Sequence, residues 1–386
     1  YTYVKGSEYE DIAASWDWDL IPGITTDYQA TPLDCGSTKF TGKEDFVGGV
    51  SDGSSGIAVM RYTNPSTGKL RWQKTWFFLD SGAIHVMVNV LSSTSGAPVY
   101  SVLDQKRLSG KTYINGAIDS GAGEYNNLQT IWHNEVLWNF PGSTSLFLRK
   151  GQRTGAWSDI GTSTQPPSTV NMWAAWLQHK TLSAPVEYTV FPNVKAEAIQ
   201  AVRAATPVKT IVNTKDYSAI WDKAGHRAFL VFWNNNGGSI VVPTANSGFA
   251  PLTISTSVAT TLIVSFKDGQ VVVSDPSQTL QSTSINFAFG PGSLPKFWTS
   301  SSRTKSLSVA FPQGGMIGSS VRDPFEKVCT QLCEMISCRS SAALHLTIVI
   351  HSLIKPKYIH VINMLSNLSP LTSPAYPLFP MGATID

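Results

Sequence analysis

Charged residues are scarce in this chain of 386 residues, and long apolar runs are absent. Asp, Glu, Lys and Arg make up 14% of the sequence, whereas an average globular protein contains about 25%. The formal charge of +3 at neutral pH is too small to favour binding to nucleic acid or to a membrane surface. No run of about 18 apolar residues occurs, so the sequence predicts no transmembrane helix.

Cysteine is also rare. Cys35 stands alone in the body of the chain, whereas Cys329, Cys333 and Cys338 lie together near its end. An odd cysteine in the body argues against a disulfide scaffold. The later three lack the paired C-x-x-C spacing of a structural zinc site. Walker, G-x-G-x-x-G and H-E-x-x-H motifs are absent as well. We therefore expect neither a metal ion nor an organic cofactor.

Uncharged polar residues and aromatic residues take the place of the missing charges. Ser, Thr, Gly and Asn are abundant, which suits an extracellular all-β protein, and 12 tryptophans are present. Tryptophan stacks on sugar rings but also fills β-sheet cores, so composition leaves both uses open. The chain starts at Tyr1 without a methionine or an apolar leader, and we interpret its true N-terminus as missing.

Short apolar segments separated by turn residues predict a large antiparallel β-sandwich, because helical periodicity is almost absent. One helix is predicted over 194–203, with Asn193 as its N-cap. The predicted strands are 57–62, 70–79, 83–91, 99–103, 129–138, 145–149, 170–177, 186–191, 208–212, 218–221, 226–233, 239–242, 262–266, 270–274, 284–289 and 307–311.

A polar connector with Gly and Pro at 243–251 predicts a domain boundary. We expect a large β domain over 1–245 and a small β domain over 251–322. From 327 to 386 the strand pattern stops, and His345, His351 and His360 lie close together. This atypical tail is interpreted either as a helix or as sequence from another reading frame or a retained intron.

Several motifs in the sequence have catalytic roles in other proteins, but each also has a structural interpretation. G-V-S-D-G at 49–53 matches the G-x-S-x-G pattern of serine hydrolases, which requires a strand before the serine and a helix after it. A strand–loop–strand context is predicted instead, so glycines that permit tight turns are the favoured interpretation. The body histidines lie in or beside predicted strands, which favours structural roles for His85, His133, His179 and His226.

Two loops and a series of later motifs resemble the β domains of the family 8 polysaccharide lyases, which include hyaluronate, chondroitin AC and xanthan lyases. W-D-W-D-L-I-P-G-I-T-T at 16–26 and F-V-G-G-V-S-D-G at 46–53 are similar to the start of the family's central domain. Further similar segments follow in the family's order, and together the matches span 9–321. They are W-F-F-L-D at 76–80, L-D-Q-K-R-L-S-G at 103–110, I-W-H-N at 131–134, T-G-A-W-S-D-I at 154–160, Y-T-V-F-P-N at 188–193, S-D-P-S-Q at 274–278 and P-Q-G-G-M-I-G-S-S-V at 312–321.

The resemblance implies a large antiparallel β super-sandwich over 1–245 followed by a small C-terminal β-sandwich over 251–322, without the family's N-terminal α/α toroid. It also implies a secreted, monomeric lyase that cleaves an anionic, uronate-containing polysaccharide by β-elimination. The family's base, acid and carboxylate-neutralising residues belong to the toroid, so none is assigned here. The chain alone is therefore expected to be a fragment with little or no activity.

Three residues are the sequence's candidates for the site. Glu44, beside Asp45, is the nearest match to an acidic residue that the family's β domain contributes in support of the toroid's site. Loop acids also cap turns, which the residues alone favour. Trp16 and Trp18 are candidates for sugar stacking, with packing as the alternative.

Two functions from other classes stay open, namely a non-catalytic carbohydrate-binding β protein and a structural surface protein. The gene sequence upstream of Tyr1 separates the first from a lyase, since amphipathic helices should be encoded there only for the lyase.

Overall fold

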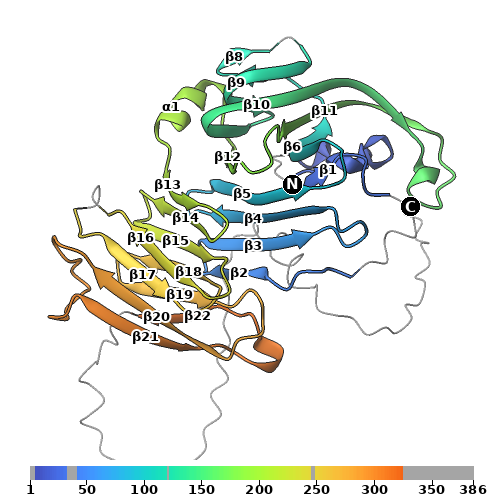
Figure 1. Cartoon of the computed structure of the whole chain (residues 1–386). Coiled ribbons are helices and arrows are strands. Elements are labelled where there is room, and N and C mark those ends of the chain that lie inside the picture. Colours follow the sequence, from blue (N-terminus) through green and yellow to red (C-terminus); the bar gives the residue numbers. More distant parts are fainter. Residues whose placement is uncertain (1–4, 33–40, 120, 245–247, 325–386) are drawn as a thin grey trace, which may run out of the picture. The chain divides into compact units, whose positions relative to one another are not determined.

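Residues 5–32, 41–119, 121–244 and 248–324 are described by the computed structural model, and nearly all of their regular structure is β-strand (Figure 1). This confirms the predicted all-β class with large antiparallel sheets. The chain divides into the units Tyr1–Val328 and Cys329–Asp386. The four cysteines and the tail at 327–386 lie outside the described residues, so the interpretations placed on them stay predictions.

The first half of the chain forms one large antiparallel sheet of twelve described strands. Its order is β1-β6-β11-β10-β12-β5-β4-β3-β2, and β9 joins β7 and β8 to β10. The strands are β1 (Thr25–Asp27), β2 (Val47–Ser51), β3 (Gly56–Thr63), β4 (Leu70–Phe78), β5 (Ile84–Ser93), β6 (Val99–Arg107), β7 (Thr112–Ile114), β8 (Ala117–Ile118), β9 (Gly123–His133), β10 (Val136–Gly155), β11 (Ser168–Gln178) and β12 (Val186–Pro192).

Two further sheets are formed by the strands after β12. A six-stranded sheet has the order β13-β14-β15-β18-β19-β22, and a four-stranded sheet has the order β16-β17-β20-β21. Their strands are β13 (Val208–Asn213), β14 (Tyr217–Asp222), β15 (Arg227–Phe232), β16 (Gly238–Val242), β17 (Leu252–Thr256), β18 (Thr260–Ser265), β19 (Gln270–Ser274), β20 (Ser282–Phe289), β21 (Thr304–Ala310) and β22 (Val321–Pro324). The predicted strands 262–266 and 270–274 correspond to β18 and β19, which pair as an antiparallel hairpin.

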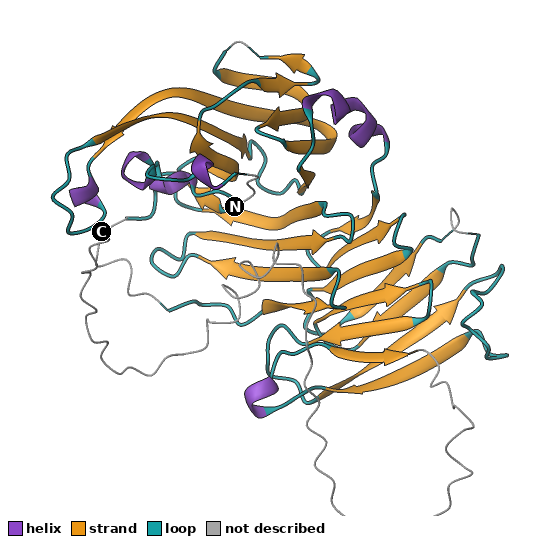
Figure 2. Ribbon diagram, turned by 180° about the vertical axis from the view of Figure 1, so that it is seen from behind, coloured by secondary structure: helices purple, strands orange, loops and turns teal. Residues whose placement is uncertain are grey.

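Apolar side chains cover both faces of the six-stranded sheet. Successive residues of a strand point to opposite faces, and β15 is buried along most of its length. Phe229 and Val231 pack in a core with Phe77 and Met87 of the large sheet. Leu230 packs in a second core with residues of the four-stranded sheet such as Phe287. The six-stranded sheet is therefore the middle layer, between β2–β5 on one side and the four-stranded sheet on the other (Figures 1 and 2).

The strands on either side of the connector 243–251 pair with each other, and the predicted division at 245–251 stays a prediction. The connector 243–251 joins β16 to β17, and these two strands pair with each other. Strands β15 and β18, which also lie on either side of the connector, pair as well. The change from the large sheet to the other two falls between β12 and β13, because β13–β15 have partners in the later sheet. Polar connectors occur both within a sheet and between domains, so composition alone does not locate a domain boundary.

Two local predictions need correction. The segment 129–138, predicted as one strand, is the hairpin β9–β10, with φ of +46° at Asn134 and +62° at Glu135. The helix predicted over 194–203 is a 3-10 turn, Ala196–Ala198, followed by α1 (Ile199–Ala204). Asn193 does not cap it, since Asn193 has φ of +62° and lies before the N-cap residue.

The segment before β1 crosses β6, β10 and β11 in three short 3-10 turns, η1 (Gly6–Glu8), η2 (Ala13–Ser15) and η3 (Trp18–Leu20). Gln105 of β6 holds η3, because its side-chain NH₂ donates to the carbonyls of Asp17 and Leu20. No helix in the described part of the chain is long and apolar enough to cross a bilayer.

Candidate functional site

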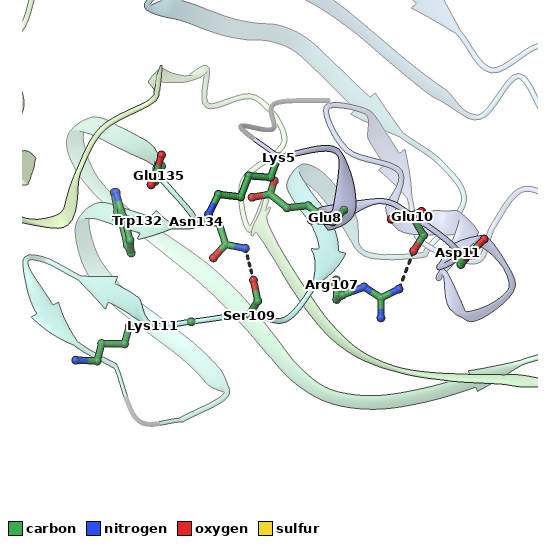
Figure 3. Close-up of a pocket in the computed structure, with 12 residues that line it drawn as sticks. Lys5, Glu8, Glu10, Asp11, Arg107, Ser109, Lys111, Trp132, Asn134 and Glu135 are labelled. Carbon is green, nitrogen blue, oxygen red and sulfur yellow. Dashed lines mark hydrogen bonds between the residues drawn. The ribbon is translucent and has the colours of Figure 1, made fainter.

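A cavity of about 410 Å³ lies where this N-terminal segment meets the end of β6 and the β9–β10 turn (Figure 3). Three stretches far apart in the sequence therefore form one site. Its lining residues are Lys5, Ser7, Glu8, Glu10, Asp11, Arg107, Ser109, Gly110, Lys111, Trp132, Asn134 and Glu135. Neither a histidine nor a tyrosine is among these lining residues.

Three lining residues have left-handed backbone conformations without being glycine. The φ angles are +51° at Asp11, +46° at Asn134 and +62° at Glu135. Such conformations cost energy and gather at functional sites, where the surrounding structure maintains them. Two side-chain contacts join the three stretches, since the Asn134 amide donates to Ser109 Oγ at 2.8 Å and Arg107 Nη2 donates to the Glu10 carbonyl at 2.7 Å. Figure 3 shows both contacts.

A buried charged cluster lies at Glu8. The Glu8 side chain is 5% exposed, and Lys106 and Asp104 are fully buried. Lys106 Nζ lies 3.3 Å from Glu8 Oε2 and 3.3 Å from Asp104 Oδ2. The Tyr9 hydroxyl donates to Asp104 Oδ1 at 2.5 Å. An ammonium group between two carboxylates explains how these charges are accommodated away from water.

The other charges of the cavity lie nearer the solvent. Glu135 forms an ion pair of 2.5 Å with Lys195. This ion pair, and to a lesser degree Lys5, hold the pKa of Glu135 below its usual value despite the opposing effect of desolvation. Lys5 and Lys111 are exposed and Arg107 is half-buried, so cationic groups are available to an anionic ligand at the rim.

The predicted site residues lie outside this cavity lining. Trp16 and Trp18 contact each other, with ring centroids 5.6 Å apart. Trp18 is 37% exposed, and its indole N–H donates to the Ala13 carbonyl. Glu44 is half-buried and accepts a hydrogen bond from the Thr63 hydroxyl. The structure thus brings the two tryptophans together and places Glu44 apart from them, and the roles suggested for all three stay predictions.

The other motifs have structural surroundings. G-V-S-D-G at 49–53 leads from β2 through a loop into β3, which confirms the predicted strand–loop–strand context and excludes a nucleophile elbow there. His85 Nδ1 bonds Thr189 Oγ1 and His179 Nε2 bonds Ser101 Oγ, both at 2.8 Å. Burial, with Lys74 as a second cause, lowers the pKa of His179 to about 4.

No group of three or more His, Cys, Asp and Glu side chains in the described ranges is arranged to hold a metal ion. Glu8 was not predicted, because its surroundings come from β6. The sequence contains a signal for β6 rather than for Glu8, since L-D-Q-K-R at 103–107 places charged residues in a segment that the structure shows to be a strand. Charged residues in the interior of a sheet are rare unless they are paired.

Comparison with known proteins agrees with this architecture. The model of the polysaccharide lyase family 8 super-sandwich domain matches residues 1–203, and that of the family's C-terminal β-sandwich domain matches 209–284. This chain belongs to polysaccharide lyase family 8. The second match begins at β13, where the strand pairings also change sheet.

Two relatives illustrate how much of the family's length is covered. Chondroitinase-AC of Pedobacter heparinus is 25% identical over 334 residues, which are 82% of this chain and 44% of the relative. Xanthan lyase of a Bacillus species is 27% identical over 201 residues, which are 47% of this chain and 22% of the relative. The chain thus spans less than half the length of these relatives.

Solved structures show the same fold. A chondroitinase AC lyase studied with oligosaccharides has a TM-score of 0.69 at 23% identity, covering 82% of this chain and 45% of the other. A Paenibacillus xanthan lyase has a TM-score of 0.68 at 18% identity, covering 81% and 31%.

Proposed function

We propose that this family 8 chain forms the β-sheet wall of a polysaccharide lyase groove, and that the cavity at Glu8 faces the glycan. The observation that carries the proposal is the carboxylate of Glu8, which is buried and ion-paired at a cavity whose rim carries Lys5, Arg107 and Lys111. The substrate class is an anionic, uronate-containing polysaccharide of the chondroitin, hyaluronan or xanthan type. The names of the two relatives support this class.

The chemistry proposed is β-elimination. The C5 proton of a uronic acid becomes acidic enough to remove when its carboxylate is neutralised. A base then takes this proton while an acid protonates the glycosidic oxygen that leaves C4, and an unsaturated sugar remains. The cationic rim side chains would attract the uronate. Glu8 would accept a hydrogen bond from a group that acts on the sugar and so hold that group in place.

The proton-transferring groups are proposed to lie outside the lining described here. The resemblance implies that the family's base and acid belong to the N-terminal toroid, and the described lining contains neither a histidine nor a tyrosine. The chain by itself should therefore release little or no unsaturated product. We further propose that it acts as an extracellular, monomeric protein in carbohydrate breakdown.

Binding to the full 386-residue chain tests the proposal. Chondroitin, hyaluronan and xanthan oligosaccharides should shift the NMR amide signals of 107–111 and 132–135. The double variant Arg107→Ala, Lys111→Ala should raise the dissociation constant obtained from these shifts about tenfold, which corresponds to about 1.4 kcal/mol of binding free energy. Lys267→Ala, an exposed lysine outside the cavity lining, is the matched control and should bind normally.

The proposal fails if every oligosaccharide leaves the cavity signals unchanged or shifts signals elsewhere instead. Release of unsaturated product by the chain alone, seen as ultraviolet absorbance of the new C4–C5 double bond, would overturn the separate expectation that it is inactive.

A further inference from the structure

Glu8 and Lys106 come from elements that the sequence places far apart. Glu8 ends η1, whereas Lys106 lies near the end of β6, 98 residues later. Lys106 and Asp104 are two residues apart on one strand, so their side chains project from the same face. This face points to η1, because Lys106 contacts Glu8 and Asp104 accepts from the Tyr9 hydroxyl.

The geometry points to Lys106 as a positioning residue that fixes the Glu8 carboxylate at the cavity and keeps it ionised. The role in a lyase rests on the proposed function, whereas the ion pair itself does not. A carboxylate in a water-poor site either pairs with a cation or takes up a proton. Lys106 Nζ, 3.3 Å from Glu8 Oε2, provides such a cation.

Asp104 is the second partner of this ammonium group. Lys106 Nζ lies equally far, at 3.3 Å, from an oxygen of each carboxylate. The hydroxyl of Tyr9 donates to the other oxygen of Asp104. Asp104 therefore holds both Lys106 and the backbone next to Glu8, and the four groups join the N-terminal segment to β6.

The neighbouring His133 adds no competing positive charge. Its Nδ1 lies 3.1 Å from the Lys111 carbonyl, which can only accept a hydrogen bond, so Nδ1 carries the proton. Burial, followed by the charge of Lys106 and more weakly that of Lys150, lowers the pKa of His133 to about 3 against the weaker effect of the bond to Lys111. The imidazole is thus neutral at physiological pH, and Lys106 holds the positive charge beside Glu8.

A carboxylate held in this way suits the elimination proposed above. Fixed dipoles and charges stabilise a transition state because they need no rearrangement during the reaction. Loops provide such geometry less well than regular elements do. Glu8 lies on a short 3-10 turn, and the contact with β6, a strand paired on both sides in the large sheet, supplies the missing rigidity.

The titration of the Glu8 carboxyl in the full chain tests this inference without requiring activity. Carbon-13 labelling of glutamate side chains, with Glu8→Gln to assign the signal, reports its protonation directly. Lys106→Met should raise the midpoint of the Glu8 titration by about 2 pH units, and Lys106→Arg should restore most of the difference. Lys111→Met, a cavity lysine without an ion pair to Glu8 among the described contacts, is the control and should leave the midpoint in place.

A second variant keeps the test decisive if Lys106→Met does not fold. Asp104→Asn removes the carboxylate that competes with Glu8 for Lys106. The midpoint of the Glu8 titration should therefore fall. An unchanged midpoint in folded Lys106→Met, or a rise in Asp104→Asn, would overturn the inference. If the midpoints shift as expected but oligosaccharides do not disturb the cavity signals, the positioning of Glu8 by Lys106 stands and the proposed lyase groove fails.

Discussion

A single buried lysine, Lys74, anchors the W-D-W-D-L-I-P-G-I-T-T motif at 16–26 through its P-G turn. The ammonium group of Lys74 is fully buried, donates to the Gly23 carbonyl at 2.7 Å and lies 5.3 Å from the Trp76 ring centroid. Gly23 belongs to the P-G turn at 22–23, so Lys74 attaches this turn to β4. Burial alone lowers the pKa of Lys74 to about 7.

The lowered pKa predicts that stability rises with pH above neutrality. Between the folded pKa near 7 and the unfolded value of 10.5, the unfolded chain binds a proton that folded Lys74 has released. The free energy of unfolding should therefore increase by about 1.4 kcal/mol per pH unit from pH 7.5 to 9. Urea unfolding should show this slope in the wild type and lose it in Lys74→Met. Lys69→Met, at an exposed lysine, should keep it, and an equal slope in all three would contradict the prediction.

Residues such as Glu8 could not be recognised from the sequence. G-S-E-Y-E-D at 6–11 contains three acids with nothing local to distinguish them. Glu8 differs because β6, far along the chain, brings Lys106 to it. Glu44 was predicted from the family resemblance, and Trp16 and Trp18 from the ability of tryptophan to stack on sugar rings. Neither basis reports which side chains become partners in the fold.

Among elements, β2 shows why the segment F-V-G-G-V-S-D-G at 46–53 is rich in glycine. A Cβ added at Gly48 would lie 2.9 Å from Pro276 Cα, so the strand approaches the later sheet too closely for a side chain. The loop between β2 and β3 is also bonded to that region, because Ser320 Oγ accepts from the Ser51 amide at 3.0 Å. Glycine at 48 therefore permits contact between sheets.

Asp52 organises this loop. Its carboxylate accepts from the amides of Ser54 and Ser55 at 3.0 and 2.7 Å and lies 3.5 Å from Arg227 Nε. Desolvation acts to raise the pKa of Asp52, but these amides, the Ser55 hydroxyl and Arg227 together lower it below its usual value. The guanidinium of Arg322 donates to the Asp52 carbonyl. One residue thus joins the loop to β15 and β22.

Asp52→Ala should therefore destabilise the chain by about 2 kcal/mol at pH 7, because it leaves two amides and Arg227 without their acceptor. Since the folded pKa is depressed, this contribution is present above the ordinary carboxyl range and is lost as pH falls through the folded pKa. The difference between Asp52→Ala and wild type in urea unfolding should shrink as the pH falls below the ordinary carboxyl pKa of 3.8. Asp45→Ala, at an exposed acid nearby, should be neutral. An equal loss in both variants would refute this role for Asp52.

The strands were largely predictable because alternation of apolar residues is a local property of the sequence. The hairpin at 134–135 was missed because Asn134 and Glu135 turn without glycine or proline. The partners of β13–β15 were missed for another reason. Strand pairing depends on which sheet covers a strand. The sequence of β15 is apolar along most of its length, so its pattern does not indicate which sheet it joins.

In the whole part of the chain that the structure describes, the six-stranded sheet packs on the large sheet. The two regions matched by the family models therefore share one core. Phe229 of β15 is fully buried and packs edge-to-face on Phe77 of β4, with ring centroids 6.3 Å apart. Phe46 and Trp233 form a second ring contact, which is tilted, with centroids 5.3 Å apart. Arg61 Nη2 also donates to the Trp233 carbonyl at 2.6 Å. Regions matched by separate family models are therefore expected to unfold together.

Phe229→Ala tests this cooperativity. The substitution leaves a cavity between the large sheet and the six-stranded sheet and should cost about 3–5 kcal/mol. Urea unfolding should remain a single transition at a lower midpoint, and hydrogen exchange should accelerate in β4 and β18 alike. Val241→Ala, at a side chain 54% exposed on β16, is the control and should change neither. If β18 loses protection while β4 keeps it, the two regions unfold separately, and their shared core does not couple them.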